Sequence, residues 1–428
     1  MELKKYKLGE ILDVTRGASL SGEFYAAEGE YVRLTCGNFD YQNNCFKENK
    51  AKDNLYYIGD FKPDFLMKEG DIITPLTEQA IGLLGSTAII PESGKYIQSQ
   101  DVAKIVCKEH LLNKDFAFYL ISSNLVKQQL SAAAQQTKIR HTSPDKIKDC
   151  IVWIPELEEQ KRIGKLLRTI DLKIELNRQL NHNLEAMAKQ LYDYWFVQFD
   201  FPDENGKPYK SSGGKMVWDK RLKREIPLLW KAKIVEEVAD VYNGATPSTV
   251  NELNYGGDIV WITPKDLSDQ KQKFVYQGER NISQVGYDSC STHLLPSNTI
   301  LMSSRAPIGL LAIAKTELCT NQGFKSFVSK SKNIATYLYY YLQYHITQIE
   351  QLGTGTTFKE VSREDILKFP MLKPSDNVLD LWEEIVSALN DRQLEIQKEN
   401  ENLIKQRDEL LPLLMNGQVS VNYDLSHD

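Results

Sequence analysis

The chain has 428 residues, of which 42% are hydrophobic, enough for two or three globular domains. A formal net charge of −6 excludes a uniformly basic nucleic-acid-binding surface but allows a local one. No apolar run approaches the ~20 residues of a membrane helix. We therefore expect no membrane contact. The six cysteines are scattered without a C-x-x-C pair, so a reducing cytoplasm is the expected setting.

Residues 1–155 form the first predicted domain. Short apolar runs separated by Gly, Pro and Asn predict mixed strands and short helices. Several loops carry Arg, Lys, Asn, Gln and Thr, the side chains that read base edges and hold phosphates. The DNA-contact candidates here are Thr15, Arg16, Thr35, Asn38, Thr77, Gln79, Gln136, Thr137, Lys138 and Arg140. For any single residue, an ordinary surface loop is the competing interpretation.

Residues 156–200 predict a long helix. Between Glu156 and Tyr194 the only glycine is Gly164, and there is no proline. Apolar residues recur at heptad spacing, which is typical of a helix that pairs with another helix. The predicted seam of this helix contains Ile163, Ile170, Asn181 and Leu184.

Residues 201–230 read as a basic linker rich in Gly, Pro, Ser and Lys. Between residues 205 and 233 there are nine Lys or Arg and two Asp or Glu in an otherwise acidic chain. The two interpretations are a solvated linker and a segment that contacts phosphates near the middle of a bound duplex.

Residues 231–374 form the second predicted domain, with the same order of apolar runs and polar loops as the first. Its tyrosine-rich stretch, 337–344, is more typical of a helix packed in a core than of a platform for stacking bases. The DNA-contact candidates here are Asn243, Thr246, Thr263, Lys265, Ser303, Ser304, Arg305, Thr356, Thr357 and Lys359.

Residues 375–417 predict a second long helix, with a seam that contains Leu389, Ile396, Asn400 and Leu403. A shift of 219 residues carries Asn181 onto Asn400. Because the same face recurs in both helices, a pseudo-twofold antiparallel coiled coil is expected, with the buried asparagines fixing its register. About 38 residues at 1.5 Å each would span roughly 57 Å. The alternative is two independent helices, each packed on its own domain.

The two halves of the chain repeat one another. Val14 and Gly17 match Val241 and Gly244, and QSQDVAKIV (98–106) matches TNQGFKSFV (320–328). The helices follow each domain in the same order. The period is far longer than that of a solenoid, so the sequence predicts two copies of one domain.

Catalytic motifs are missing from the sequence. There is no phosphate-binding G-x-x-x-x-G-K-[ST], no Asn/Asp-Pro-Pro-aromatic methyltransferase motif, no H-E-x-x-H and no G-x-S-x-G. The six histidines do not cluster at ligand spacing. We therefore expect no catalytic residue, no metal and no cofactor on this chain. A nuclease or methyltransferase with unrecognised motifs, and a coiled-coil scaffold without a DNA role, stay open.

Several segments resemble the specificity subunit of Type I restriction–modification enzymes. GATPSTVNELNYGGDIVWITPKDLSD (244–269) and ILMSSRAPIGLLAIAKTELCTNQGFKSF (300–327) are similar to recognition-domain segments of that family. EEQKRIGKLL and the following residues (158–202) resemble its central conserved region, and LLPLLMNGQVSV (410–421) its C-terminal ending. The first copy departs from the pattern, with TRGASLSGEFY and YVRLTCGNF at the equivalent places.

The resemblance implies an α/β (α+β) fold. Two similar target recognition domains, 1–155 and 231–374, would be separated by long antiparallel coiled-coil helices related by an internal pseudo-twofold. The helices would be the central conserved helix, 156–200, and the C-terminal conserved helix, 375–417.

The resemblance also implies a noncatalytic subunit that reads a bipartite, asymmetric target in double-stranded DNA. Its partners would be two modification subunits that bind S-adenosylmethionine, together with two restriction subunits where these are present. ATP and magnesium would belong to those partners. The recognition subunit of another methylation-based defence system is a related alternative.

Overall fold

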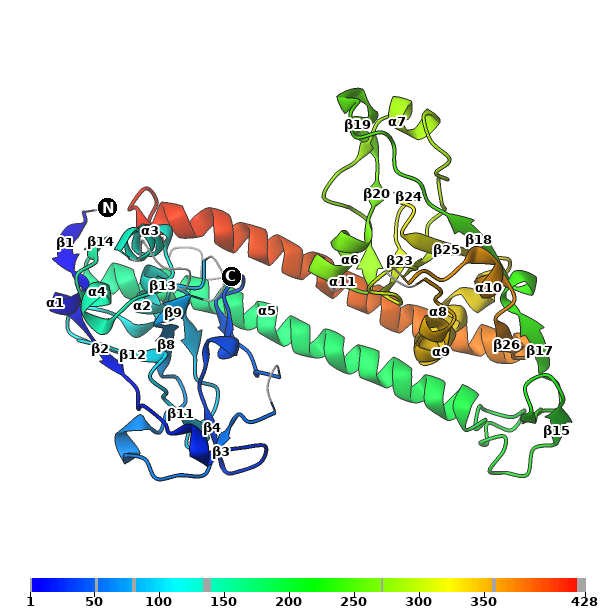
Figure 1. Cartoon of the computed structure of the whole chain (residues 1–428), viewed down its shortest axis with the longest axis horizontal. Helices are drawn as coiled ribbons and strands as arrows, with labels where there is room; N and C mark the ends of the chain where they lie inside the picture. Colours follow the sequence, from blue (N-terminus) through cyan, green and yellow to red (C-terminus); the bar gives the residue numbers. More distant parts are fainter. Residues whose placement is uncertain are drawn as a thin grey trace, which may run out of the picture. The chain divides into compact units, whose positions relative to one another are not determined.

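The computed structural model describes residues 2–50, 53–78, 82–133, 140–270, 272–355 and 359–421. Contacts divide the chain into two compact units. The first unit contains residues up to Leu176 and those from Asn400 onward, and the second contains Asn177–Glu399. Helices α5 (Leu157–Tyr192) and α11 (Asp376–Met415) contribute residues to each unit (Figure 1).

The first unit is built on an antiparallel sheet with the strand order β10-β8-β12-β2. A smaller sheet has the order β11-β4-β7-β3, and β1 pairs with β14 beside the helices. The sheet strands are β2 (Leu12–Arg16), β3 (Tyr25–Ala26), β4 (Tyr31–Arg33), β7 (Tyr56–Tyr57), β8 (Ile72–Pro75), β10 (Ala88–Ile89), β11 (Tyr96–Ile97) and β12 (Val102–Cys107). The first unit also contains β1 (Lys4–Lys7), β9 (Thr77–Glu78), β13 (Arg140–His141), β14 (Ile151–Ile154), α2 (Lys114–Ile121), α3 (Asn124–Ala133) and α4 (Pro144–Lys148).

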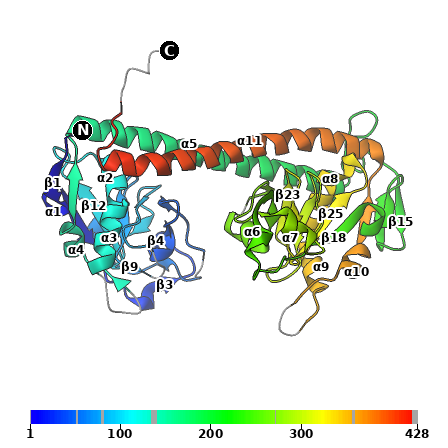
Figure 2. The ribbon, with the colours of Figure 1, turned by 90° about the horizontal axis from the view of Figure 1, so that it is seen from above.

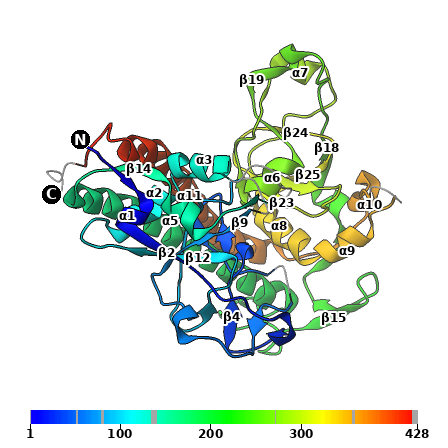
Figure 3. The ribbon, with the colours of Figure 1, turned by 60° about the vertical axis from the view of Figure 1, so that its left-hand side comes forward.

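The second unit repeats this plan. Its main sheet has the order β18-β25-β22-β23-β21, and β17 pairs with β26 as β1 does with β14. Its strands are β17 (Lys231–Ile234), β18 (Ala239–Asn243), β20 (Trp261–Ile262), β21 (Phe274–Val275), β22 (Ile300–Ser303), β23 (Leu311–Ala314), β24 (Cys319–Thr320), β25 (Phe324–Ser329) and β26 (Pro370–Lys373). The helices are α6 (Pro264–Gln270), α7 (Gln284–Asp288), α8 (Ala335–Tyr344), α9 (Ile346–Gln351) and α10 (Arg363–Leu367). In this unit α8 lies between the sheet and α11 (Figure 2), whereas α7 and β19 (Tyr255–Ile259) lie away from α11 (Figure 3).

The short helices before each long helix show how the repeat is encoded. The Ser143 hydroxyl oxygen accepts a hydrogen bond from the Lys146 N–H at the start of α4. The Ser362 hydroxyl oxygen accepts one from the Asp365 N–H at the start of α10. Serine is a favoured N-cap because its side chain satisfies an orphan backbone donor. The two matching serines therefore begin equivalent helices.

The matching glycines allow a close backbone approach in each unit. A Cβ on Gly17 would lie 2.3 Å from the Gln98 carbonyl oxygen, and a Cβ on Gly244 would lie 2.1 Å from the Asn321 carbonyl oxygen. Neither distance is compatible with a side chain. Each glycine thus lets the end of a sheet strand pass directly against a polar turn.

Substituting either glycine with alanine is expected to destabilise its unit by about 1–3 kcal/mol, the cost of overpacking a closely packed site. Thermal unfolding of Gly17→Ala and Gly244→Ala measures this effect. Gly22→Ala is the control, since the nearest atom to its added Cβ is 3.9 Å away. Equal stability of all three variants would contradict the close approach.

The long helices are antiparallel within each unit. In the second unit the Asn181 side-chain amide donates to the Gln393 carbonyl oxygen at 3.3 Å. In the first unit the Asn400 amide donates to the Ile174 carbonyl oxygen at 3.5 Å. A shift of 219 residues carries 181 onto 400 and 174 onto 393, so the two bonds are pseudo-twofold equivalents. The expected antiparallel pairing and internal repeat are confirmed.

The predicted seam residues are covered to different degrees. Ile163 and Ile396 are fully buried, whereas Ile170, Leu184, Leu389 and Leu403 are partly exposed. In the second unit, α8 packs in one cluster with residues of both long helices and so covers part of the seam there.

The tyrosine-rich helix α8 belongs to the core of the second unit. Tyr337, Tyr339, Tyr340 and Tyr341 are buried, and Tyr344 is 52% exposed. They pack against a cluster of rings from both long helices and the segment that follows α5. This packing agrees with the core interpretation of the tyrosine run and not with a stacking platform for bases.

Residues 201–230, expected as a basic linker, form a folded part of the second unit. Phe201 stacks on Trp230 with ring centroids 4.9 Å apart, and on Tyr209 at 4.7 Å. A hairpin of β15 (Met216–Asp219) and β16 (Arg224–Pro227) follows. The aromatic side chains anchor the segment, while Lys207, Lys210, Lys215, Lys220, Arg221 and Lys223 are exposed.

Candidate nucleic-acid interface

Three backbone hydrogen bonds hold together the loops of the candidate site in the second unit. The Ala245 N–H donates to the Thr320 carbonyl at 2.9 Å, and the Ser304 N–H donates to the Gly323 carbonyl at 2.7 Å. The Val361 N–H donates to the Ser304 carbonyl at 3.0 Å. These bonds bring together polar loops that lie far apart in the sequence, at the ends of β18, β22 and β24 and before α10.

Exposed polar side chains gather on these loops. Thr246 donates a hydrogen bond to the Gln322 side chain, and both residues are exposed. The exposed Arg305 pairs with Glu360, with 2.9 Å between Nε and Oε2. Asn243 and Lys359 are exposed on adjoining segments. The set can donate to base edges and to phosphates.

A buried lysine lies beneath this surface. Lys325 is only 4% exposed, and its Nζ is 3.3 Å from Glu360 Oε1 and 3.4 Å from Ser304 Oγ. Glu360 is therefore held by two cations, one buried and one exposed. Because Lys325 holds the carboxylate from below, the carboxylate in turn orients the Arg305 guanidinium.

The first unit contains the same three backbone bonds. The Ala18 N–H donates to the Gln98 carbonyl at 3.0 Å, and the Leu76 N–H donates to the Asp101 carbonyl at 2.8 Å. The Thr142 N–H donates to the Leu76 carbonyl at 2.9 Å. Each set of three bonds, with the loops that it joins, is called a frame, and the frame is thus repeated in the two units.

The side chains on the two frames differ. Arg305 follows β22 and forms a bridge with Glu360, and Thr77 follows the equivalent strand β8 and pairs with His141. Thr77 and His141 therefore occupy in the first unit the positions of Arg305 and Glu360 in the second. The Thr77 hydroxyl lies 3.3 Å from His141 Nδ1 and 3.4 Å from an Asp101 carboxylate oxygen. An ion pair in one frame is therefore replaced by a hydroxyl–imidazole–carboxylate cluster in the other.

Arg16 in the first unit lies at the position that Asn243 occupies in the second. Arg16 is the last residue of β2, which pairs with β12, and Asn243 is the last residue of β18, which pairs with the equivalent strand β25. The Arg16 guanidinium Nε donates to the Gln100 carbonyl at 2.8 Å, and the side chain is exposed, as is that of Thr15. The first frame therefore also presents a cation, at a different position.

Several predicted contact residues serve instead to hold loops in place. Asn38 is 1% exposed, and its side-chain oxygen accepts from the Thr35 N–H at 2.9 Å. Thr263 makes the matching bonds to Asp266, with 2.7 Å from its N–H and 2.6 Å from its hydroxyl. Thr77, Ser303 and Ser304 are also buried. The buried side chains shape the site from within, whereas Thr35 and Thr263 are half-buried.

The remaining predicted contacts are placed only in part. Lys265 is exposed and pairs with the exposed Glu279 at 2.8 Å, which raises the pKa of the lysine. Arg140 lies in β13 opposite Glu78. The candidates that lie outside the described residues are Gln79, Gln136, Thr137, Lys138, Thr356 and Thr357.

Two exposed glutamines lie beside the two frames but were not among the DNA-contact residues predicted from the sequence. Gln100 and Gln322 occupy equivalent positions, each two residues after the carbonyl that accepts the Ala18 or Ala245 bond. The signal that could have found them is the match between QSQD and TNQG, in which the glutamine recurs at the same place.

No group of three His, Cys, Asp or Glu able to hold a metal ion occurs among the residues that the structure describes. Within the same residues, no helix is long and apolar enough to cross a membrane. The two frames together define a protein with paired polar surfaces suited to binding DNA.

Comparison with known proteins agrees with this class. The family described as Type I restriction modification DNA specificity domain matches residues 1–186 and 227–406, once for each copy. The Type I restriction enzyme HindI specificity subunit of Haemophilus influenzae is 24% identical over 97% of this chain and 99% of its own. The MjaIX specificity subunit of Methanocaldococcus jannaschii is 35% identical, but the match covers 45% of this chain and 46% of that relative.

The crystal structure of a Type I restriction–modification S subunit from M. genitalium has a TM-score of 0.61 and 15% identity, covering 97% of this chain and 96% of that one. That likeness supports the fold. Because the family match spans most of the sequence, the chain belongs to the Type I restriction–modification DNA specificity family. Its role is DNA sequence specificity, and it is a noncatalytic component.

Proposed function

We propose that the chain reads a bipartite, asymmetric DNA target, one half-site by residues 1–155 and the other by residues 231–374. The observation that carries this proposal is the repeated backbone frame with different side chains. Equivalent frames can meet equivalent groove faces when half-sites are about one helical turn apart. Different donors and acceptors on those frames would select different bases.

In this proposal the exposed residues of each frame contact DNA, and the buried ones hold their positions. The proposed contacts are Thr15, Arg16, Gln100 and His141 in the first unit and Asn243, Thr246, Lys265, Arg305, Gln322 and Lys359 in the second. The predicted residues that lie outside the described ranges stay proposed on sequence grounds alone.

The helices 156–200 and 375–417 would act as a spacer that sets the gap between half-sites. We further propose that the chain recruits two methyltransferase subunits that bind S-adenosylmethionine, and that restriction subunits using ATP and magnesium join them. A cytoplasmic setting, supported by the scattered cysteines, belongs to the same proposal.

The test is to co-express the chain with its methyltransferase subunits and map methylated bases across the host genome by long-read sequencing. A bipartite motif should appear only with this chain. Exchanging residues 1–155 or 231–374 for those of a relative should change one half-site and leave the other. Methylation that is unaltered by deleting the chain would overturn the proposal and favour a scaffold role.

A further inference from the structure

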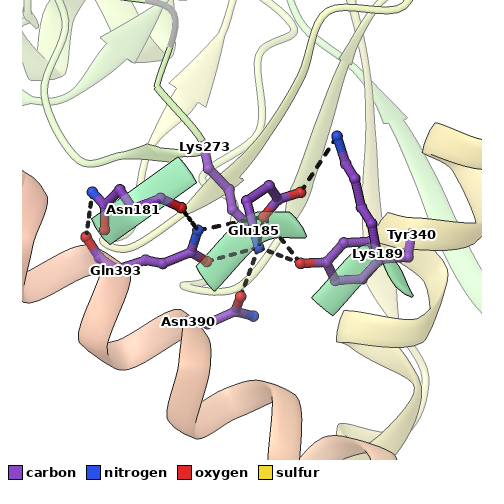
Figure 4. Close-up of polar contacts among 7 residues, drawn as sticks. All are labelled: Asn181, Glu185, Lys189, Lys273, Tyr340, Asn390 and Gln393. Atoms are coloured by element: carbon purple, nitrogen blue, oxygen red, sulfur yellow. Dashed lines mark hydrogen bonds and ion pairs between the residues drawn. The ribbon is translucent and has the colours of Figure 1, made fainter. Parts of the chain in front are cut away.

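A buried lysine joins the second recognition domain to both long helices. Lys273 lies in the loop before β21, and its ammonium is 2.7 Å from Glu185 of α5 and 2.7 Å from Asn390 of α11 (Figure 4). It is also 2.6 Å from the Tyr340 hydroxyl of α8 and 3.1 Å from the Gln393 side-chain oxygen. Four partners on three helices thus converge on one cation.

The partners are themselves fixed. The Tyr340 hydroxyl donates to Glu185 at 3.1 Å, and the Gln393 side-chain amide donates to the Asn181 carbonyl at 3.2 Å. The Lys273 side chain is only 10% exposed. A charge so buried is tolerated only when it is paired and hydrogen-bonded, so any movement of the domain on the helices would carry a large electrostatic cost.

The lysine also belongs rigidly to the recognition sheet. Its carbonyl accepts a hydrogen bond from the Ile313 N–H at 2.8 Å, and the next residue, Phe274, pairs with Ile313 in the sheet. The contact therefore acts on the whole sheet and not on a loose loop. It fixes the angle at which the sheet meets the helix pair of the second unit.

In the described part of the first unit, the helix positions that contact Lys273 in the second unit are occupied by other residues. The shift of 219 residues puts Ile404, Asp171 and Ile174 at the positions of Glu185, Asn390 and Gln393. Two of the three polar partners are thus replaced by isoleucines.

A different contact occurs in the first unit. The Tyr119 hydroxyl of α2 donates to Asp171 at 2.5 Å, and Arg407 of α11 pairs with Asp171 at 2.9 Å. The carboxylate still comes from α5, but the cation comes from α11 and not from the recognition sheet. Because the first unit builds the same plan with this different contact, the plan itself does not require the contacts of Lys273.

We propose that Lys273 is a positioning residue that sets the orientation of the second recognition domain on the helix pair, and through it the gap length that the protein accepts. This inference rests on the proposed function. With the ammonium held, one orientation is strongly favoured and one gap is read. Without it, neighbouring orientations become accessible, while the loops that read the half-site are unaltered.

The test compares methylated motifs in cells that express the chain with its methyltransferase subunits, using wild type and Lys273→Met. Methionine fills a similar space without a charge. The variant should keep both half-site sequences but methylate targets whose gap is about one base pair longer or shorter. We expect the preference for the native gap over these neighbours to fall at least about tenfold, since several buried polar contacts are lost.

Two further variants complete the design. Lys273→Met with Glu185→Met replaces the buried pair by apolar residues, a change that is often tolerated, and it should show the same broadened gap even if the single variant accumulates poorly. Lys330→Met is the control, because Lys330 is 44% exposed and pairs with Asp240 inside the recognition domain.

The outcomes separate this inference from the proposed function. A native gap preference in the double variant, with methylation merely reduced or normal, would overturn the positioning role and leave the proposed function standing. A wild-type chain that directs no bipartite methylation would overturn both.

An independent readout is the pH dependence of stability. Burial lowers the pKa of Lys273 to about 8 from 10.5, and the nearby carboxylate of Glu185 only partly offsets this effect. The charged and titratable groups around the ammonium are Glu185 and Lys189 of α5, Tyr339 and Tyr340 of α8, and Lys315 after β23. Below pH 8 both the folded and the unfolded chain hold the proton. Between about pH 8 and 10.5 the folded chain releases it first, so stability rises with pH.

Wild type should therefore gain melting temperature relative to Lys273→Met as the pH rises from about 8 to about 10. Thermal unfolding of the two proteins over that range measures the difference. A constant difference would show that folding does not lower the pKa of Lys273, and that Glu185 fully offsets the effect of burial.

Discussion

Replacing Trp382 with alanine should destabilise the second unit more than either glycine substitution destabilises its own unit. Trp382 is fully buried, and its ring centroid lies 4.9 Å from that of Phe196, 5.7 Å from Tyr340 and 5.9 Å from Tyr192. These rings come from α5, the short π-helix Asp193–Val197 that follows it, and α8, so one side chain joins the helix pair to the recognition domain. Removing a buried tryptophan typically costs about 3–5 kcal/mol.

Calorimetry of the purified chain measures this effect, which should appear as a drop of roughly 10 °C in the unfolding of the second unit. Trp382→Phe should cost much less, because it keeps a ring in place and removes an indole N–H that has no hydrogen-bond partner among the described residues. Trp218→Ala is the surface control, since Trp218 is 63% exposed. Similar losses for Trp218 and Trp382 would contradict the central position of Trp382.

Replacing Arg305 with alanine should have the largest effect on DNA recognition. The guanidinium is exposed, is oriented by Glu360, and lies on the loop frame of the second unit. If it contacts a base edge, its loss should cost about 1–3 kcal/mol, or roughly 5- to 150-fold in affinity, and relax the sequence at one position of one half-site. If it contacts a phosphate, binding should weaken for all sequences and the salt dependence should become less steep.

Binding of the assembled complex to duplexes with each base substituted, at several salt concentrations, distinguishes these two results. Arg392→Ala is the matched control. Arg392 is likewise exposed and paired with a glutamate, Glu395 at 2.9 Å, but it lies on α11 away from the loop frame. Unaltered affinity and sequence preference in the Arg305 variant would remove this residue from the interface.

The differences between the two frames bear on how specificity could diverge. Backbone bonds, matching glycines and capping serines are common to both units, whereas the side chains at the positions of Arg305, Glu360 and Gly323 are replaced by Thr77, His141 and Asp101. The shared features are those that define the loop geometry. The variable ones lie on or directly beneath the exposed surface of the loops, so under the proposed function a new target can arise without a new fold.

The internal repeat, the two long helices with their antiparallel pairing, and the DNA-specificity family could all be predicted from the order of amino acids. Each of these rests on local periodicity or on ordered segments along the chain, such as the 219-residue shift that relates Asn181 to Asn400. The sequence also showed which polar loops recur. It could not show which of their side chains face outward.

The folded chain was needed to show that Asn38 is a buried cap while Gln322 is exposed, and that residues 201–230 pack on an aromatic core. The same is true of Lys273, whose partners Glu185, Asn390 and Gln393 lie far from it in the sequence. The physical reason is that the burial of a polar side chain depends on the elements that pack over it. Those elements come from distant parts of the chain, and no local pattern records them.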